Sequence, residues 1–288
     1  MPLWLIYPFA VAFGAVCGSF LNVVVVRLPR GESVVFPGSR CVVCGAAIRA
    51  YDNIPVLSYL LLRGRCRRCG ARFSARYAVI EAVCGGAAAA LIATFGVGWA
   101  SLGFFAFFWL LLGIAAIELE HWIIPHELSW PGIGIGLLFS WVNPRASPRA
   151  AVLGAGLAWA AFTLLAWVGE KVFRKEALGL GDRWLLAMEG AFLGWSALLP
   201  IVFLSSVQGS IVGLVLMATG RAQTGKPRAN QASDPASAAQ PDEDDWVPPR
   251  NALPFGPFLA LGAIEWLFLG PGLWAWYQAK LLQALSLS

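Results

Sequence analysis

Two acidic side chains end a long apolar run near the middle of the chain. Residues 82–117 carry no charge, and the segment IELEHWIIPHELSW that follows brings Glu118 and then Glu120. A carboxylate at the end of an apolar helix is costly to bury, so it usually has a function. These acids are therefore the first candidates for chemistry.

A second candidate acid, Asp182, lies in the segment KEALGLGDRW. Gly179 and Gly181 allow the backbone to break just before a helix and to approach its neighbours closely. An aspartate at that position can serve as a helix N-cap. It can also pair with an acid on another helix, and the sequence leaves both interpretations open.

A pair of acids from different helices would have a defined chemistry. Two carboxyl groups held close together share one proton, so the ionised group can deprotonate water while the protonated group polarises a peptide carbonyl. This is the chemistry of aspartic peptidases. Asp182 with either Glu118 or Glu120 would supply such a pair.

Two histidines lie beside the first acids and suggest a metal site as an alternative. Glu120, His121 and His126 could in principle ligate one ion. Pro125 interrupts the helix before His126, however, so the spacing matches no familiar metal motif. Polar residues at a helix end are the favoured interpretation.

Three more acids fall in predicted helices. Glu81 is interpreted as a polar partner inside the bundle. Glu189 follows Asp182 by seven residues, about two helical turns, and so lies on roughly the same face. It either joins the site or meets a polar neighbour. Glu265, in the last predicted helix, has the same two interpretations but is harder to place.

Four cysteines form the pattern C-x2-C-x21-C-x2-C, at Cys41, Cys44, Cys66 and Cys69. Two such pairs can put four thiolates around one Zn²⁺, and a glycine after each pair lets the chain turn. A closed site with four sulfur ligands is structural. Two disulfides or free thiols are the alternative, which a reducing compartment disfavours.

Arginines are concentrated around the second cysteine pair. A small basic ribbon could bind nucleic acid, but arginines beside a membrane domain more simply mark its inner face and contact acidic lipid headgroups. We therefore expect the lipid bilayer as a partner and no nucleic acid.

The elements that must position these residues are membrane helices. The chain is 58% hydrophobic and only 13% charged, against about 25% charged for a soluble domain. We predict an all-α polytopic membrane protein with about eight transmembrane helices and a small zinc-ribbon-like loop. The predicted helices are 3–26, 77–96, 101–118, 127–142, 151–168, 184–199, 201–218 and 255–276.

Positive charge predicts the orientation. With the N-terminus outside, the loops 27–76, 119–126, 169–183 and 219–254 face the cytoplasm and hold 18 of the 21 Lys and Arg residues. The positive-inside rule favours this topology. It puts Glu118 and Asp182 at the cytoplasmic ends of their helices.

The chain divides into five predicted parts. They are a first helix (1–26), a cytoplasmic four-cysteine loop (27–76), a transmembrane core (77–218), a linker (219–252) and a last helix with its tail (253–288). The linker is expected to be disordered because it is rich in proline and poor in apolar residues.

Several motifs in order resemble one family. They are GSFLNVVVVRLPR, the cysteine tetrad around DNIPVLSYLLLRGRCRRCG, FSARYAVIEAV, IELEHWIIPHELSWPGI, EALGLGD with GAFLGW, and LPFGPFLALGA. The chain resembles the type IV prepilin peptidases, GxGD-type intramembrane aspartic peptidases that are also N-methyltransferases, over nearly its whole length.

The resemblance implies an enzyme of the bacterial inner membrane, with its active site facing the cytoplasm. Such an enzyme cleaves the leader peptide of type IV pilin or pseudopilin precursors and methylates the new N-terminus from S-adenosylmethionine. By position, the catalytic pair falls on Glu118 and Asp182. No motif locates the methyl donor, although the resemblance favours the loop near DNIPVLSYLLLRG.

Four positions depart from the family pattern. Glu118 stands where the first catalytic aspartate is usual, His126 replaces another aspartate, and Trp184 replaces a lysine. Glu189 occupies a position that is usually apolar. The extra methylene of Glu118 could displace its carboxyl group. The alternative function is therefore a paralogue with impaired cleavage, which acts as a methyltransferase only or binds precursors during assembly.

Overall fold

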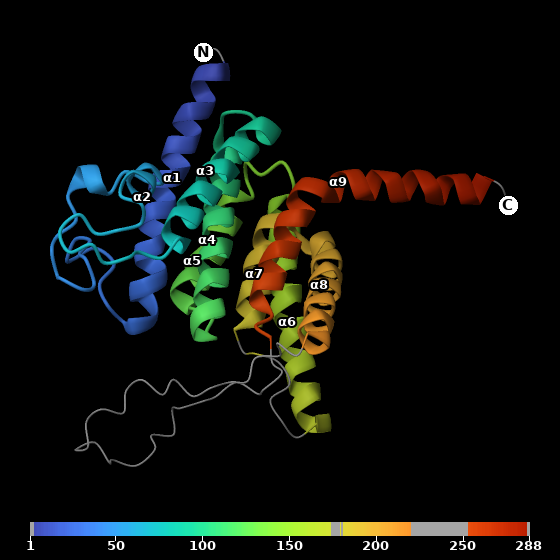
Figure 1. Ribbon diagram of the computed structural model, residues 1–288. Helices are drawn as coiled ribbons and strands as arrows, with labels where there is room; N and C mark the ends of the chain where they lie inside the picture. Colours follow the sequence, from blue (N-terminus) through green and yellow to red (C-terminus); the bar gives the residue numbers. More distant parts are fainter. Residues whose placement is uncertain (1–2, 174–178, 180, 220–252, 287–288) are drawn as a thin grey trace.

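The protein is helical almost throughout the residues that the computed structural model describes, 3–173, 179, 181–219 and 253–286 (Figure 1). The helices are α1 (Leu3–Arg27), α2 (Leu57–Leu61), α3 (Arg76–Phe95), α4 (Trp99–His121), α5 (His126–Phe139), α6 (Pro148–Phe173), α7 (Asp182–Leu193), α8 (Leu198–Ala218) and α9 (Gly256–Ser286). Short 3-10 turns occur at Leu28–Arg30, Ala50–Asp52 and Trp195–Ala197.

Each of the eight predicted helices is confirmed, and the protein is an all-α, multi-pass membrane protein. In the described part of the chain, six helices are long and apolar enough to cross a bilayer. The other two, α5 with 14 residues and α7 with 12, are shorter than the roughly 20 residues of a full span. The predicted end of α7 at residue 199 is wrong, because Gly194 takes φ 81° and stops the helix.

Glycines let neighbouring helices pack backbone to backbone. A Cβ on Gly18 of α1 would stand 2.8 Å from the Glu81 Cα of α3, and Gly190 of α7 meets the backbone of Gly154 in α6 just as closely. Small residues at helix interfaces are the usual basis of packing in membranes, where burial from lipid gives little driving force. These contacts fix α3 on α1 and α7 on α6.

The end of α4 is set by local backbone geometry. Trp122 adopts a left-handed conformation, and its N–H donates to the Glu118 carbonyl at 2.9 Å. Pro125 then precedes the first residue of α5 and cannot continue the preceding helix. Glu118 consequently occupies the last turn of α4.

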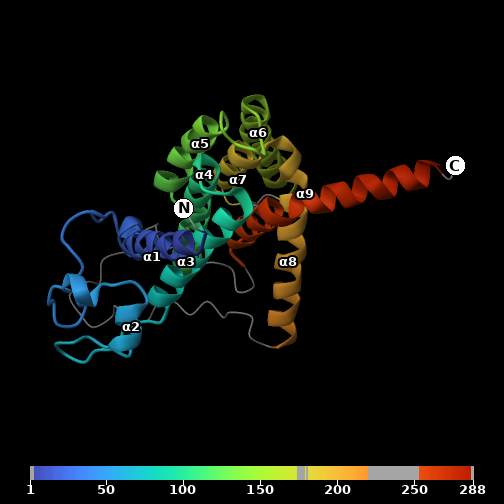
Figure 2. The same cartoon turned by 90° about the horizontal axis from the view of Figure 1, so that it is seen from above.

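The helices form one bundle, with the segment between α1 and α3 beside it. Figures 1 and 2 show this segment lying against α1, outside the packed helices. The last helix, α9, contains Pro271, and its C-terminal part turns away from the bundle (Figure 1). A proline inside a helix removes a hydrogen bond and allows such a bend.

The predicted linker at 219–252 lies outside the described residues apart from Thr219. The five-part division of the chain stays a prediction.

Candidate active site

Three helix ends bring the two predicted catalytic acids together. Glu118 is in the last turn of α4, Asp182 is the first residue of α7, and Gly256 is the first residue of α9. Both acids are buried, each with 6% of its surface exposed. The Gly256 N–H donates to Glu118 Oε1 at 3.2 Å. The start of α9 thus holds one of the two carboxylates.

Ile124 fills the space between these elements. Its Cβ would stand 2.7 Å from a Cβ on Gly181, and its Cδ1 would stand 3.3 Å from one on Gly256. A Cβ on Gly256 would also overlap the Glu118 carboxylate. A side chain at position 181 would clash with Ile124, and one at position 256 would clash with Glu118. Both positions therefore require glycine.

The two carboxyl groups interact electrostatically, and each has an oxygen without a hydrogen-bond partner among the described residues. Glu118 and Asp182 are close enough for their charges to interact. Glu118 Oε2 and Asp182 Oδ1 are buried without a hydrogen-bond partner among the described residues. Buried polar atoms are usually paired, so a site with two unpaired acidic oxygens is suited to bind a water molecule or a peptide group.

Glu120, the other acid considered for this pair, lies outside the site. Its carboxylate forms an ion pair with Arg76 at the start of α3, and its side chain is 40% exposed. Successive residues on a helix point in different directions, which separates Glu118 from Glu120. The geometry thus favours Glu118.

The alternative metal site at the histidines is not supported. The imidazole of His126 stacks on Trp130 with ring centroids 5.2 Å apart, and Trp184 packs edge-on against both rings. Among the residues that the structure describes, only the four cysteines are grouped as metal ligands. His126 and Trp184, two of the departures from the family pattern, share this aromatic cluster.

The remaining acids have different environments. Glu189 is fully buried in α7, its two carboxyl oxygens have no partner in the described residues, and it interacts electrostatically with Asp182. Glu265 accepts a hydrogen bond from Gln208. Glu81 accepts a hydrogen bond from the Val56 N–H at 2.7 Å. It therefore connects α3 to the four-cysteine loop, in addition to its predicted role as a polar partner inside the bundle.

The four cysteines come together as predicted. Their sulfur atoms lie within 4.8 Å of one another, and those of Cys41 and Cys69 are 3.8 Å apart. Four sulfurs at about 2.3 Å from a tetrahedral zinc would be about 3.8 Å apart. A disulfide needs about 2.05 Å, and all six cysteines are free thiols.

The two cysteine pairs have the same local structure. Gly45 and Gly70 take φ 66° and 72°, and each donates its N–H to the carbonyl of the first cysteine of its pair at 2.9 Å. Backbone hydrogen bonds from Cys44 and Val43 lower the pKa of the Cys41 thiol to about 6. Both features match a metal-binding knuckle.

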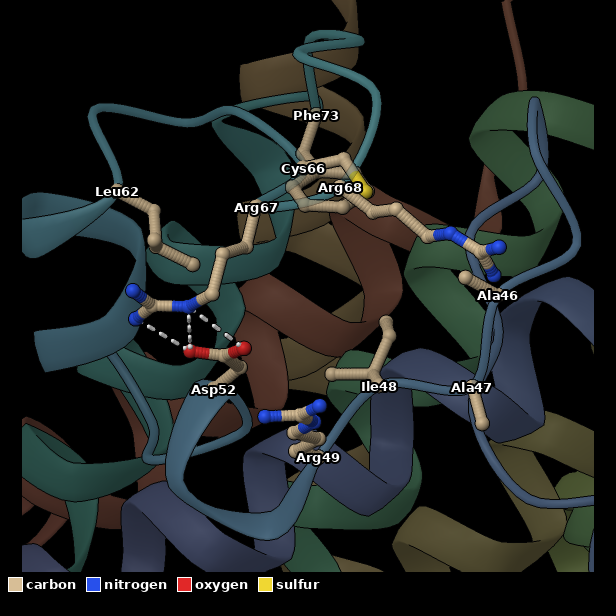
Figure 3. A pocket seen from close by; sticks show the side chains of 10 residues that line it. All are labelled: Ala46, Ala47, Ile48, Arg49, Asp52, Leu62, Cys66, Arg67, Arg68 and Phe73. Carbon is tan, nitrogen blue, oxygen red and sulfur yellow. Dashed lines mark hydrogen bonds and ion pairs between the residues drawn. The ribbon is translucent and has the colours of Figure 1, made fainter.

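An ion pair joins the turn after the first knuckle to the second knuckle. Arg67 donates to both carboxylate oxygens of Asp52 at 2.7 to 3.0 Å, beside a cavity of about 420 Å³ (Figure 3). The guanidinium of Arg67 holds the pKa of Asp52 below its usual value. Asp52 therefore has a structural partner in the folded loop.

Sequence reasoning missed the contributions of Gly256 and Ile124. Gly256 belongs to the segment LPFGPF, in which a glycine between prolines signals an unusual helix start. Nothing in the local sequence shows that this start contacts a carboxylate 138 residues away. Ile124 carries no signal at all, because an apolar residue in a membrane protein is unremarkable.

Comparison with known proteins identifies the family. A family model described as the bacterial peptidase A24 N-terminal domain matches residues 12–95, and the type IV leader peptidase family matches residues 105–214. A prepilin leader peptidase/N-methyltransferase of Myxococcus xanthus is 38% identical over 94% of this chain and 92% of its own length. The chain belongs to the type IV leader peptidase family.

Other family members cover the chain equally well. Proteins with the same name from Burkholderia pseudomallei (strain 1026b) and Aeromonas hydrophila are 36% and 32% identical, over 94% and 97% of this chain and 87% and 96% of their own lengths. No solved structure matches the chain. The resemblance drawn from the motifs is confirmed over nearly the whole sequence.

Proposed function

We propose that this protein is a membrane-embedded aspartic endopeptidase with N-methyltransferase activity. Its substrates are type IV prepilin or pseudopilin precursors, whose leader peptide it removes and whose new N-terminus it methylates from S-adenosylmethionine. The observation that carries the peptidase assignment is the pair of buried carboxyl groups on α4 and α7, each with an oxygen that finds no partner in the part of the chain that the structure describes.

The chemistry follows from the charge state of this pair. Two adjacent buried carboxyl groups do not both ionise, so one holds a proton. The ionised group takes a proton from water, which then attacks the peptide carbon, and the protonated group donates a hydrogen bond to the carbonyl oxygen. The Gly256 N–H fixes Glu118 for this role.

The glutamate at position 118 is compatible with this function. Its longer side chain reaches the start of α9, where an amide donates to it, and remains in electrostatic contact with Asp182. The extra methylene is thus accommodated by the bundle. No contact around Glu118 favours the alternative of a paralogue with impaired cleavage.

We expect cleavage to occur at the cytoplasmic face of the bacterial inner membrane. The positive-inside distribution puts the loop ends of α1, α4 and α6 in the cytoplasm, and Glu118 and Asp182 lie at that end. The precursor's apolar helix can lie along the bundle in the bilayer while its leader stays among the cytoplasmic loops.

The four-cysteine cluster is proposed to hold one structural Zn²⁺. Four sulfurs leave no open coordination position, so the metal would not take part in cleavage. It would instead hold the two knuckles together and so fix the loop that packs beside α1.

The test is cleavage of a type IV prepilin from the same genome by the full-length protein in membranes. We expect Glu118→Gln and Asp182→Asn each to abolish leader removal, because each substitution removes one acid of the pair. Glu127→Gln, which changes an exposed acid of α5, is the matched control and should cleave like wild type. Cleavage that survives either site substitution would refute the assignment.

A further inference from the structure

A second cavity, of about 490 Å³, lies between the cytoplasmic end of α1, the start of α3 and the four-cysteine loop. It is separate from the acidic pair, and its size is within the range of cofactor pockets. We infer that this cavity is the methyl-donor site and that Asn22 and Glu81 form its polar inner wall. The inference rests on the methyltransferase half of the proposed function.

Asn22 provides the observation that points to a ligand. The side chain is 3% exposed and lines the cavity. Its Nδ2 donates to the Tyr77 carbonyl at 3.0 Å, which fixes the amide, while its Oδ1 has no partner in the described part of the chain. A buried carbonyl oxygen without a hydrogen bond is destabilising, so an amine or amide donor bound here would restore the missing hydrogen bond.

Glu81 adds a carboxylate to the same wall. It is 9% exposed, lines the cavity and accepts the Val56 N–H. Val56 has φ 61°, which is unfavourable for a β-branched residue. Such conformations persist where the surroundings enforce them, often at binding sites. Glu81 thus holds the residue that precedes α2, the helix that carries Ser58 and Tyr59 to the cavity.

The chemistry of the wall fits S-adenosylmethionine in particular. Its sulfonium and ammonium groups are cationic and suit the carboxylate of Glu81, and aromatic faces such as Tyr59 and Tyr77 attract cations and stack on purines. Its carboxylate suits a guanidinium, and Arg30 and Arg72 also line the cavity. A single cavity therefore offers groups for each charged part of the molecule.

Methyl transfer also requires that the new N-terminus be a free amine. The N-terminal ammonium would first lose a proton to water, which frees the nitrogen lone pair. That lone pair would bond to the methyl carbon while the carbon–sulfur bond breaks with its electrons staying on sulfur. The methylated nitrogen, then cationic, would become a neutral amine by releasing one proton to water. The peptidase product supplies this amine, so both reactions need sites that one substrate can reach.

The two sites are linked through one ion pair. Glu120 follows Glu118 by two residues on α4 and pairs with Arg76, which precedes the cavity residue Tyr77. This ion pair joins the last turn of α4, which also carries Glu118, to the start of α3, which lines the cavity. A cleaved precursor can move its new terminus from one site to the other without leaving the membrane.

The experiment measures equilibrium binding of radiolabelled S-adenosylmethionine to full-length protein in lipid nanodiscs. Wild type is expected to bind one molecule, and Asn22→Leu and Glu81→Gln are each expected to raise Kd by about tenfold, or about 1.4 kcal/mol. Glu81→Gln keeps an oxygen that can accept the Val56 N–H, so it removes charge with little change in structure.

Asn143→Leu is the matched control. Asn143 also donates its side-chain amide to a backbone carbonyl, that of Phe192, but it lies between α5 and α6, away from the cavity. It should bind the methyl donor like wild type. In the same preparations, methylation of a precursor should fall much more than its cleavage in the two cavity variants.

Equal Kd values in wild type, both cavity variants and the control would overturn the assignment of this cavity. A wild-type protein that cleaves precursors but binds no S-adenosylmethionine would overturn it together with the methyltransferase half of the proposed function. Cavity-dependent binding by a protein that cleaves nothing would support the site while refuting the peptidase half.

Discussion

Replacing Glu118 by aspartate tests whether this site is built for the longer side chain. Aspartate is the family's usual residue at this position, so a simple reading of the resemblance expects Glu118→Asp to improve cleavage. The structure predicts the opposite result, because the carboxylate of Glu118 is held by an amide that a shorter side chain cannot reach.

The magnitude follows from the geometry. Removing one methylene withdraws the carboxyl group by about 1.5 Å, the length of one carbon–carbon bond. The distance from Oε1 to the Gly256 nitrogen would grow from 3.2 Å to about 4.7 Å, beyond hydrogen-bonding range. A misplacement of about 1 Å can cost about 100-fold in rate. We expect kcat/KM to fall by about 10- to 100-fold.

The assay is a time course of leader removal from a prepilin, with enzyme and substrate in the same membranes. Glu120→Asp is the matched control, since it makes the same chemical change two residues away, at a carboxylate paired with Arg76. It should change the rate by less than about threefold. Cleavage by Glu118→Asp at or above the wild-type rate would refute the reasoning and show that the bundle tolerates or prefers aspartate.

Three further perturbations have defined outcomes. Gly256→Ala places a methyl group on the Glu118 carboxylate and should reduce cleavage by about 100-fold, whereas Gly272→Ala, at an open position of the same helix, should not. Purified protein should carry about one equivalent of zinc by metal analysis, lost in Cys41→Ser but kept in Cys17→Ser. An impermeant thiol reagent applied outside should label a cysteine placed at Ser147 and leave the knuckle cysteines unlabelled.

Each of these outcomes can fail independently. Normal cleavage by Gly256→Ala would show that the start of α9 does not hold the catalytic glutamate. A stable protein without zinc would refute the metal assignment. Labelling of the knuckles from outside, with Ser147→Cys protected, would invert the topology and put the acidic pair at the opposite face.

Features that depend on local composition and spacing can be predicted from the amino-acid sequence alone. Apolar runs predict the eight helices, and for the six long ones the reason is that a bilayer requires about 20 apolar residues per span. The spacing of Cys41, Cys44, Cys66 and Cys69 predicts their cluster, because each knuckle is closed by bonds within a few residues. The motifs also placed Glu118 and Asp182 in the same site, and the structure brings them together.

The choice between neighbouring residues needed the tertiary structure. Glu118 and Glu120 are the same residue type two positions apart, so the sequence does not distinguish them. In the folded protein Glu118 accepts a hydrogen bond from Gly256 at the start of α9, whereas Glu120 pairs with Arg76 at the start of α3. The predicted end of α7 is wrong by several residues, since the conformation of Gly194 stops the helix within a largely apolar run that continues through residue 204.

Long-range contacts decided the rest. Asn22 looks like an isolated polar residue in an apolar helix, and its unpaired oxygen is apparent only once Tyr77 and the four-cysteine loop surround it. The support of Glu118 by Gly256 joins residues 138 positions apart. Such contacts depend on how the helices pack against one another. Packing in a membrane is determined by the shapes of the helices and by hydrogen bonds between them, and local sequence patterns do not predict either.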